Sequence, residues 1–133
     1  MAIPLSAYPH DSSFNEETYN NMTGAAHKPS YSCCAFARYV YKQHNGKETG
    51  TSIGTSTDIA NIPKGSILKT SYAGGPHWLI VGEHKSGGKS FMVYDANFVT
   101  SPRSSSPYAV KYREVTYEDF RKKYTLQSGC LKP

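Results

Sequence analysis

One segment of the chain, between residues 33 and 44, repeats its apolar positions at helical spacing. The positions at i, i+3, i+4, i+7 and i+11 are occupied by Cys33, Phe36, Ala37, Val40 and His44. A serine at position 30 or 32 can cap the start of such a helix, and Asn45-Gly46 provides a left-handed stop at its end. The pattern predicts a helix over residues 33–44 that buries one face.

After this helix the pattern changes to short apolar runs separated by turn residues. Residues 62–68 indicate a turn that leads into a strand, and residues 77–81, 91–98 and 108–115 indicate three more strands. The Gly- and Ser-containing stretch at 85–89 predicts an antiparallel hairpin. Thr116 and Asp119 match a capping box for a short helix that ends near Tyr124. Consecutive strands after one long helix predict an α+β fold, with that helix packed on an antiparallel sheet.

Length and composition limit the organisation of the chain. With 133 residues, of which 38% are hydrophobic, we expect one compact domain at residues 31–133. Residues 1–30 have many turn-forming residues and no sustained periodicity, which predicts an N-terminal arm of turns. The chain has no apolar run near 18 residues, so we expect no membrane insertion. Its first residues have neither the basic segment nor the long apolar segment of a signal peptide. If the protein is exported, we therefore expect that a signal peptide has been removed or that export uses another route.

Charge and cysteine content exclude further classes. The net charge of +5 favours anionic surroundings such as nucleic acid, acidic wall polymers or lipid headgroups. We expect no nucleic-acid partner, because the chain has no block of five like charges and no nucleic-acid module signature. Three cysteines, two of them adjacent, are too few for a disulfide framework. Without Cys-x-x-Cys or His-x₃-His spacing, we expect no metal and no cofactor.

Two thiols lie at the start of the predicted helix. The dipole and the unpaired N–H groups of a helix N-terminus lower the pKa of a thiol there, and the thiolate is the nucleophilic form. Cys33 shares the apolar face with Ala37 and Val40, whereas Cys34 lies about 100° further around the helix. Cys33 is therefore the candidate nucleophile. The same position is also compatible with an inert buried thiol.

Two strand ends carry groups that complement a thiol. His77 opens an apolar strand after a Gly-Gly-Pro turn, where its side chain can act as a general base at the rim of the sheet. Asp95 and Asn97 end the next strand on one face, and either can bond the far nitrogen of a neighbouring imidazole. Taken singly, His77 is compatible with a structural role, and Asp95 and Asn97 with an ordinary strand end. Together with Cys33, they follow the order of nucleophile, base and orienting group in a papain-like site.

The same segments resemble those of the CHAP amidase/peptidase domains and their NlpC-type relatives. Residues 32–41 are similar to the nucleophile helix of that group, roughly Cys-x-[Ala/Gly]-Phe-[Ala/Val]-x-Tyr-Val, which places the nucleophile at Cys33. Residues 62–67 resemble its Pro-Gly-Asp strand entry, with Ser66 where Asp is usual. Residues 75–81 resemble its histidine strand, and residues 93–98 its Glu-x-Asn segment with Asp95 in place of Glu. The resemblance covers about residues 31–124.

The resemblance implies a papain-like fold and a cysteine-dependent hydrolase of amide bonds in peptidoglycan. It would be an endopeptidase or an N-acetylmuramoyl-L-alanine amidase. Cys33 would attack the carbonyl, His77 would transfer the proton, and Asp95 with Asn97 would hold the imidazole. We expect a monomer that acts outside the cell or at the wall, as a lysin or a secreted effector does. Two alternatives remain: an effector-type cysteine protease or deamidase on the same scaffold, and a catalytically silent wall-binding module.

Overall fold

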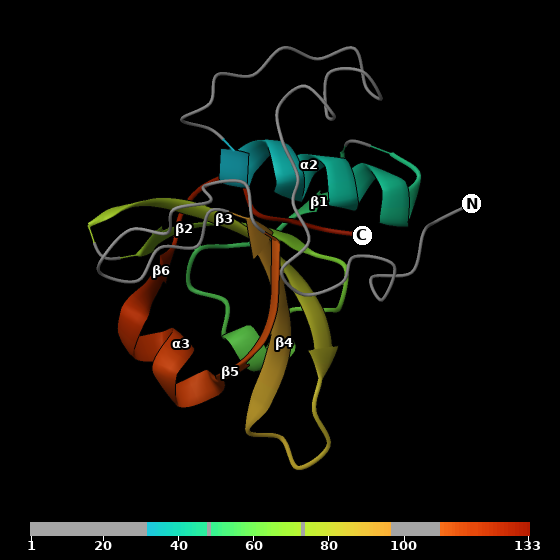
Figure 1. Cartoon of the computed structure of the whole chain (residues 1–133). Coiled ribbons are helices and arrows are strands. Elements are labelled where there is room, and N and C mark those ends of the chain that lie inside the picture. The colour runs from blue at the N-terminus through green and yellow to red at the C-terminus, as the bar shows by residue number, and fades with distance from the viewer. Residues whose placement is uncertain (1–31, 48, 73, 97–109) are drawn as a thin grey trace.

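The computed structural model describes residues 32–47, 49–72, 74–96 and 110–133 (Figure 1). For residues 32–36, 96 and 110–112 only the backbone is described. The expected arm at residues 1–30, the ends of two predicted strands at residues 97–98 and 108–109, and with them Asn97, lie outside the described residues. Of the helices in the described part, none combines the length and apolar character that crossing a membrane requires.

The described chain is α+β, as the pattern of helix and strand signals predicts. In chain order its elements are α2 (Ser32–Asn45), β1 (Thr51–Ser52), the 3₁₀ helix η3 (Ile59–Asn61), β2 (Ile67–Tyr72), β3 (Gly75–His84), β4 (Ser90–Ala96), β5 (Val110–Thr116), α3 (Tyr117–Lys123), β6 (Tyr124–Leu126) and β7 (Leu131–Lys132). The strands form one sheet in the order β1-β7-β2-β3-β4-β5, and β6 also pairs with β2. The strand pairs are antiparallel.

Helix α2 forms where the helical spacing predicts it. Ala37, Val40 and Tyr41 are buried at i, i+3 and i+4, whereas Arg38 between them is exposed. The helix ends at Asn45 and is followed by Gly46, whose φ of 76° lies in the left-handed region and whose N–H donates to the carbonyl of Lys42 at 2.8 Å. The predicted left-handed stop is confirmed.

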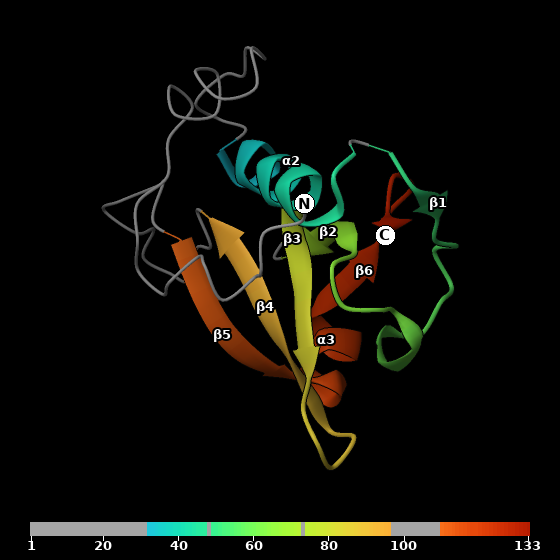
Figure 2. The same ribbon diagram turned by 90° about the vertical axis from the view of Figure 1, so that its right-hand side faces the viewer.

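The sheet has a different layer on each face (Figures 1 and 2). Helix α2 lies over one face and contacts β2, β3 and β4. The buried residues on this side include Ala37, Val40, Tyr41, Ile67, Ile80 and Tyr94. The opposite face carries a larger cluster that includes Leu68, Leu79, Val81, Phe91, Val93, Tyr117 and Phe120. Strand alternation therefore divides the apolar residues between a helix α2 layer and a layer that contains α3 and η3.

The strands after α3 were not predicted. Thr70 of β2 pairs with Leu126 of β6, and Ile67 of the same strand pairs with Leu131 of β7. Strand β7 in turn pairs with β1. Runs of two or three residues are too short to show a period of two, so the sequence pattern gives no signal for them. The sheet is consequently wider than the four predicted strands.

Helix α3 begins at the predicted capping box. The side chain of Thr116 accepts a hydrogen bond from the N–H of Asp119 at 3.0 Å. Glu118 and Asp119 lie in the first turn, and three basic residues lie in the last turn, so both ends complement the helix dipole.

We expect Thr116→Ala to lower the free energy of unfolding by about 1 kcal/mol, because the cap would be lost. Thr116→Ser should retain most of the stability, since its hydroxyl can accept the same bond. Chemical denaturation checks both variants, with Ser86→Ala in the exposed β3–β4 turn as the control. Equal losses in the Ala and Ser variants would contradict the role of the cap.

Candidate active site

His77 is held at one end of the sheet, as the third residue of β3. It pairs with Thr70 of β2, and the Thr70 hydroxyl donates a hydrogen bond to the His77 carbonyl oxygen at 2.7 Å. Only 7% of its surface is exposed. The neighbouring strand therefore fixes the backbone from which the imidazole projects.

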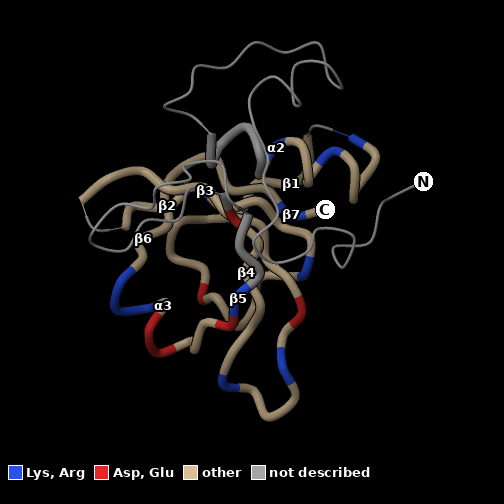
Figure 3. The backbone as a smooth tube through the Cα atoms, in the orientation of Figure 1, with Lys and Arg blue, Asp and Glu red and all other residues tan. Residues whose placement is uncertain are grey.

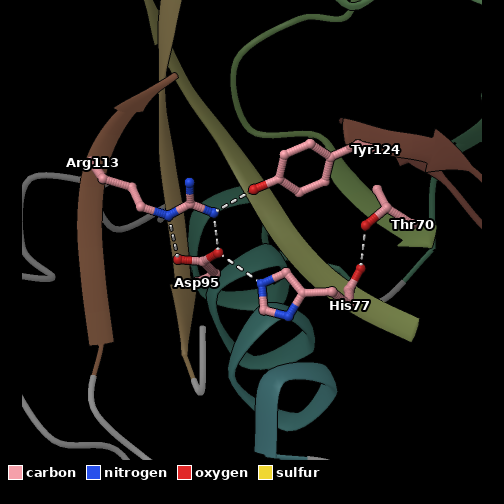
Figure 4. A network of polar contacts seen from close by, with 5 residues as sticks. All are labelled: Thr70, His77, Asp95, Arg113 and Tyr124. Atoms are coloured by element: carbon pink, nitrogen blue, oxygen red, sulfur yellow. Dashed lines mark hydrogen bonds and ion pairs between the residues drawn. The ribbon is translucent and has the colours of Figure 1, made fainter. Parts of the chain in front are cut away.

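The imidazole of His77 contacts the carboxylate of Asp95 (Figure 4). Nε2 of His77 lies 2.7 Å from Oδ2 of Asp95, and Asp95 has no exposed surface. Asp95 is the sixth residue of β4, the strand that pairs with β3. The structure thus brings together two of the four site residues that the sequence indicates.

Arg113 is a third member of this network and was not predicted. Its Nη2 donates to Oδ2 of Asp95 at 2.7 Å and to the hydroxyl of Tyr124 at 2.9 Å. Its Nε lies 3.4 Å from the other carboxylate oxygen, and 20% of its side chain is exposed. One signal was available: Arg113 alternates with Val115, so it stands on the apolar side of its strand, where an unpaired charge is rarely found.

The network keeps Asp95 ionised. Burial alone would raise the pKa of this carboxyl. The hydrogen bond with His77 and the positive charge of Arg113 outweigh burial and hold the pKa below its ordinary value of 3.8. The carboxylate in turn holds the pKa of Arg113 above its ordinary value, although burial acts the other way. Burial raises the pKa of Tyr124 to about 12, so its hydroxyl stays neutral.

An ionised Asp95 determines which nitrogen of His77 can act as a base. A carboxylate only accepts hydrogen bonds, so Nε2 of the neutral imidazole must carry the proton that is shared with Asp95. The lone pair is then on Nδ1. This tautomer is the one that an orienting carboxylate selects in a thiol–imidazole site.

The backbone of Cys33 lies at the same end of the sheet as His77. Cys33 is the second residue of α2, and the first turn of α2 lies over the end of the sheet where β4 ends and β3 begins (Figures 1 and 2). Position 33 shares the helical phase of the buried Ala37 and Val40, whereas position 34 shares that of the exposed Arg38. The side chains of both cysteines, and Asn97, lie outside the described atoms.

His77 and Asp95 stand on the face of the sheet that α2 does not cover. His77 alternates with Leu79 and Val81, and Asp95 with Val93, all of which belong to the layer with α3. Trp78 stands on the other side of the strand, where Arg38 of α2 contacts its ring. A group from the first turn of α2 and the imidazole would therefore meet around the start of β3, not across the sheet.

Two other groups of chemically reactive type, His84 and Cys130, have structural surroundings. His84 contacts the hydroxyl of Tyr117 at 2.7 Å and the carbonyl of Ile62 at 2.6 Å. Cys130 is buried, and burial raises the pKa of its thiol. Among the residues that the structure describes, no group of His, Cys, Asp and Glu could hold a metal ion. The His77–Asp95–Arg113 network is therefore the strongest candidate for chemistry in the described part.

Comparison with known proteins identifies no family for the chain. No protein-family model matches the chain, and no curated protein or solved structure matches it. Function must therefore be inferred from the site residues and their geometry.

Arg113→Met should lower the free energy of unfolding by about 3 kcal/mol, because it removes one partner from a buried charge. Arg113→Lys should recover part of this loss, since it keeps the charge without the fixed fork of donors. The matched control is Arg121→Met, which breaks the exposed ion pair with Asp58 at 2.7 Å and should have a much smaller effect. Similar losses at the two arginines in urea denaturation would contradict a buried ionic network.

The depressed pKa of Asp95 predicts a stability difference that depends on pH. A carboxyl whose pKa is lower in the folded state stabilises the fold above the unfolded pKa, and this contribution is lost as the pH falls through the folded value. The difference in unfolding free energy between the wild type and Asp95→Asn should therefore narrow as the pH falls from the ordinary carboxyl pKa of 3.8 through the lower pKa of the folded state. Denaturation across this range measures it. The Asp58 pKa is also lowered, by its hydrogen bond with Arg121, but that contribution is common to both proteins. A difference that stays constant would show that Asp95 is not ionised in the fold.

Proposed function

We propose that the protein is a cysteine-dependent hydrolase that cleaves amide bonds in the peptide part of peptidoglycan. One observation carries the proposal: His77 and Asp95 form a buried hydrogen-bonded pair at the end of the sheet where the helix with Cys33 begins. This pairing provides a base and its orienting group near a helix start, where a thiol is activated. A papain-like arrangement of helix and sheet is part of the proposal.

The reaction proposed is acyl transfer through a thioester. Cys33 attacks the scissile carbonyl after Nδ1 of His77 accepts its proton, and the imidazolium returns that proton to the leaving amine. The N–H groups at the start of α2 stabilise the oxyanion. Water, activated by the same imidazole, then hydrolyses the thioester and regenerates the thiol.

Asp95 and Arg113 support the imidazole in this scheme. The carboxylate fixes the tautomer and stabilises the imidazolium that forms during the reaction. Arg113 is a positioning residue, because it acts on the imidazole through its contact with Asp95. Two oriented donors from one guanidinium hold the carboxylate plane toward His77.

Two features favour an enzyme that acts on the wall over the alternatives. A silent binding module has no need for an ionised carboxylate that is completely buried, since its desolvation is costly. The motif resemblance to CHAP domains supports a peptidoglycan substrate. The net charge of +5 favours binding to the anionic polymers of a bacterial wall. Peptidoglycan as the partner and an extracellular or wall-acting location are part of the same proposal. An effector-type protease or deamidase would use the same site on another substrate.

Exchange of each adjacent thiol tests the proposal. Cys33→Ala should abolish the release of soluble fragments from purified peptidoglycan, because it removes the nucleophile. Cys34→Ala should retain most of this activity. Mass spectrometry of the fragments identifies the bond cut, and circular dichroism checks that both variants fold.

Full activity of Cys33→Ala would overturn the cysteine mechanism. So would complete inactivation by EDTA with rescue by zinc. If peptidoglycan stays intact while a protein substrate is cleaved or deamidated in a Cys33-dependent manner, the effector alternative is correct.

A further inference from the structure

Two cations flank the single tryptophan of the chain on the α2 side of the sheet. The guanidinium carbon of Arg38 and the Nζ of Lys69 each lie 5.8 Å from the ring centroid of Trp78. Arg38 is exposed, and Trp78 and Lys69 are half-buried. We call these three residues the Trp78 cluster. It joins three elements, α2, β2 and β3, around one aromatic ring.

Within the described part of the chain, no ion pair balances the positive charge of this cluster. Helix α2 and strand β2 contain no acidic residue at all, and Figure 3 shows only basic charges along the described part of α2. The carboxylate within β3, that of Glu83, lies near the far end of the strand and pairs with Lys64 at 3.4 Å. Among the described residues, neither Arg38 nor Lys69 has an ion pair. Two such cations beside one apolar ring favour an anionic ligand.

The Trp78 cluster lies next to the candidate active site. Trp78 directly follows His77 in β3 and stands on the side of the strand that α2 covers. Arg38 follows Cys33 by five positions in α2, which corresponds to about 7.5 Å along the helix axis. An extended peptide advances about 3.3–3.6 Å per residue. Along the helix axis, the position of Arg38 is therefore about two extended peptide residues from that of Cys33.

We propose that the Trp78 cluster is a subsite for a free carboxylate of an acidic peptide, about two residues from the bond that is cleaved. This inference rests on the proposed function and specifies its substrate class. The fork of Arg38 can bind a carboxylate with two donors, Lys69 adds a second charge, and the Trp78 ring offers an apolar surface to the peptide backbone. Stem peptides of peptidoglycan carry free carboxylates of this kind.

The position of Trp78 allows a direct binding test, because all tryptophan emission comes from the cluster. The full chain with Cys33→Ala is titrated with L-Ala-γ-D-Glu-L-Lys-D-Ala and with the same peptide after amidation of its carboxylates. Only the acidic peptide should change the emission in a saturable way, and calorimetry should give the same affinity. Arg38→Met or Lys69→Met should weaken binding about tenfold, the loss of one charge-assisted contact. Lys85→Met, in the exposed β3–β4 turn, is the matched control and should bind normally.

Equal binding of the acidic and amidated peptides, or no binding of the acidic peptide by calorimetry, would overturn the subsite. Saturable binding of inorganic phosphate without binding of the peptide would also overturn it. In the active chain, Arg38→Met should raise KM about tenfold with little change in kcat. If binding needs the carboxylate but Cys33→Ala remains active, the subsite stands and the cysteine mechanism fails. If Cys33→Ala is inactive but Arg38→Met matches the wild type in KM and binding, only the subsite fails.

Discussion

The buried charge of Asp95 is the constraint on which the candidate site depends. A carboxylate without exposed surface remains ionised only if donors surround it, and here they come from β3 and β5. Tyr124, at the junction of α3 and β6, holds the guanidinium from a third direction. Asp95 can therefore remain ionised only while these elements stay packed together, because displacement of either strand would leave its charge without a partner.

Strand β3 separates two chemical environments. One side carries His77 with the carboxylate network and the apolar layer of α3, while the other carries Trp78 with the cations of α2 and β2. Acidic and basic groups pair inside the first environment, so its charge is largely neutralised. Among the described residues of α2 and β2, the charged groups in the second environment are all basic. In the proposed function, one strand thus supplies both the base and a surface for recognition.

The sequence predicts the strongly periodic parts of this molecule and the helix ends that are marked by capping residues. The face of α2, its stop at Gly46 and the Thr116 cap depend on neighbours within a few positions, and the structure confirms them. The contact of His77 with Asp95 could be anticipated because consecutive strands usually pair. The roles of Arg113 and Tyr124 could not, because their contacts depend on a strand register and on short C-terminal strands that no local pattern indicates.

The close approach of β3 and β4 at Gly82 limits which insertions and deletions the sequence can accept. A Cβ atom at Gly82 would lie 2.9 Å from the Cβ of Met92, so any larger residue at position 82 would require a shift of the neighbouring atoms. This contact favours one register of β3, because a slip by one position would place a residue with a larger side chain at the same point. The same slip would exchange the sides of His77 and Trp78. An insertion or deletion of one residue between β2 and Gly82 would therefore be absorbed in the turn, or it would displace both the proposed base, His77, and the Trp78 cluster at once.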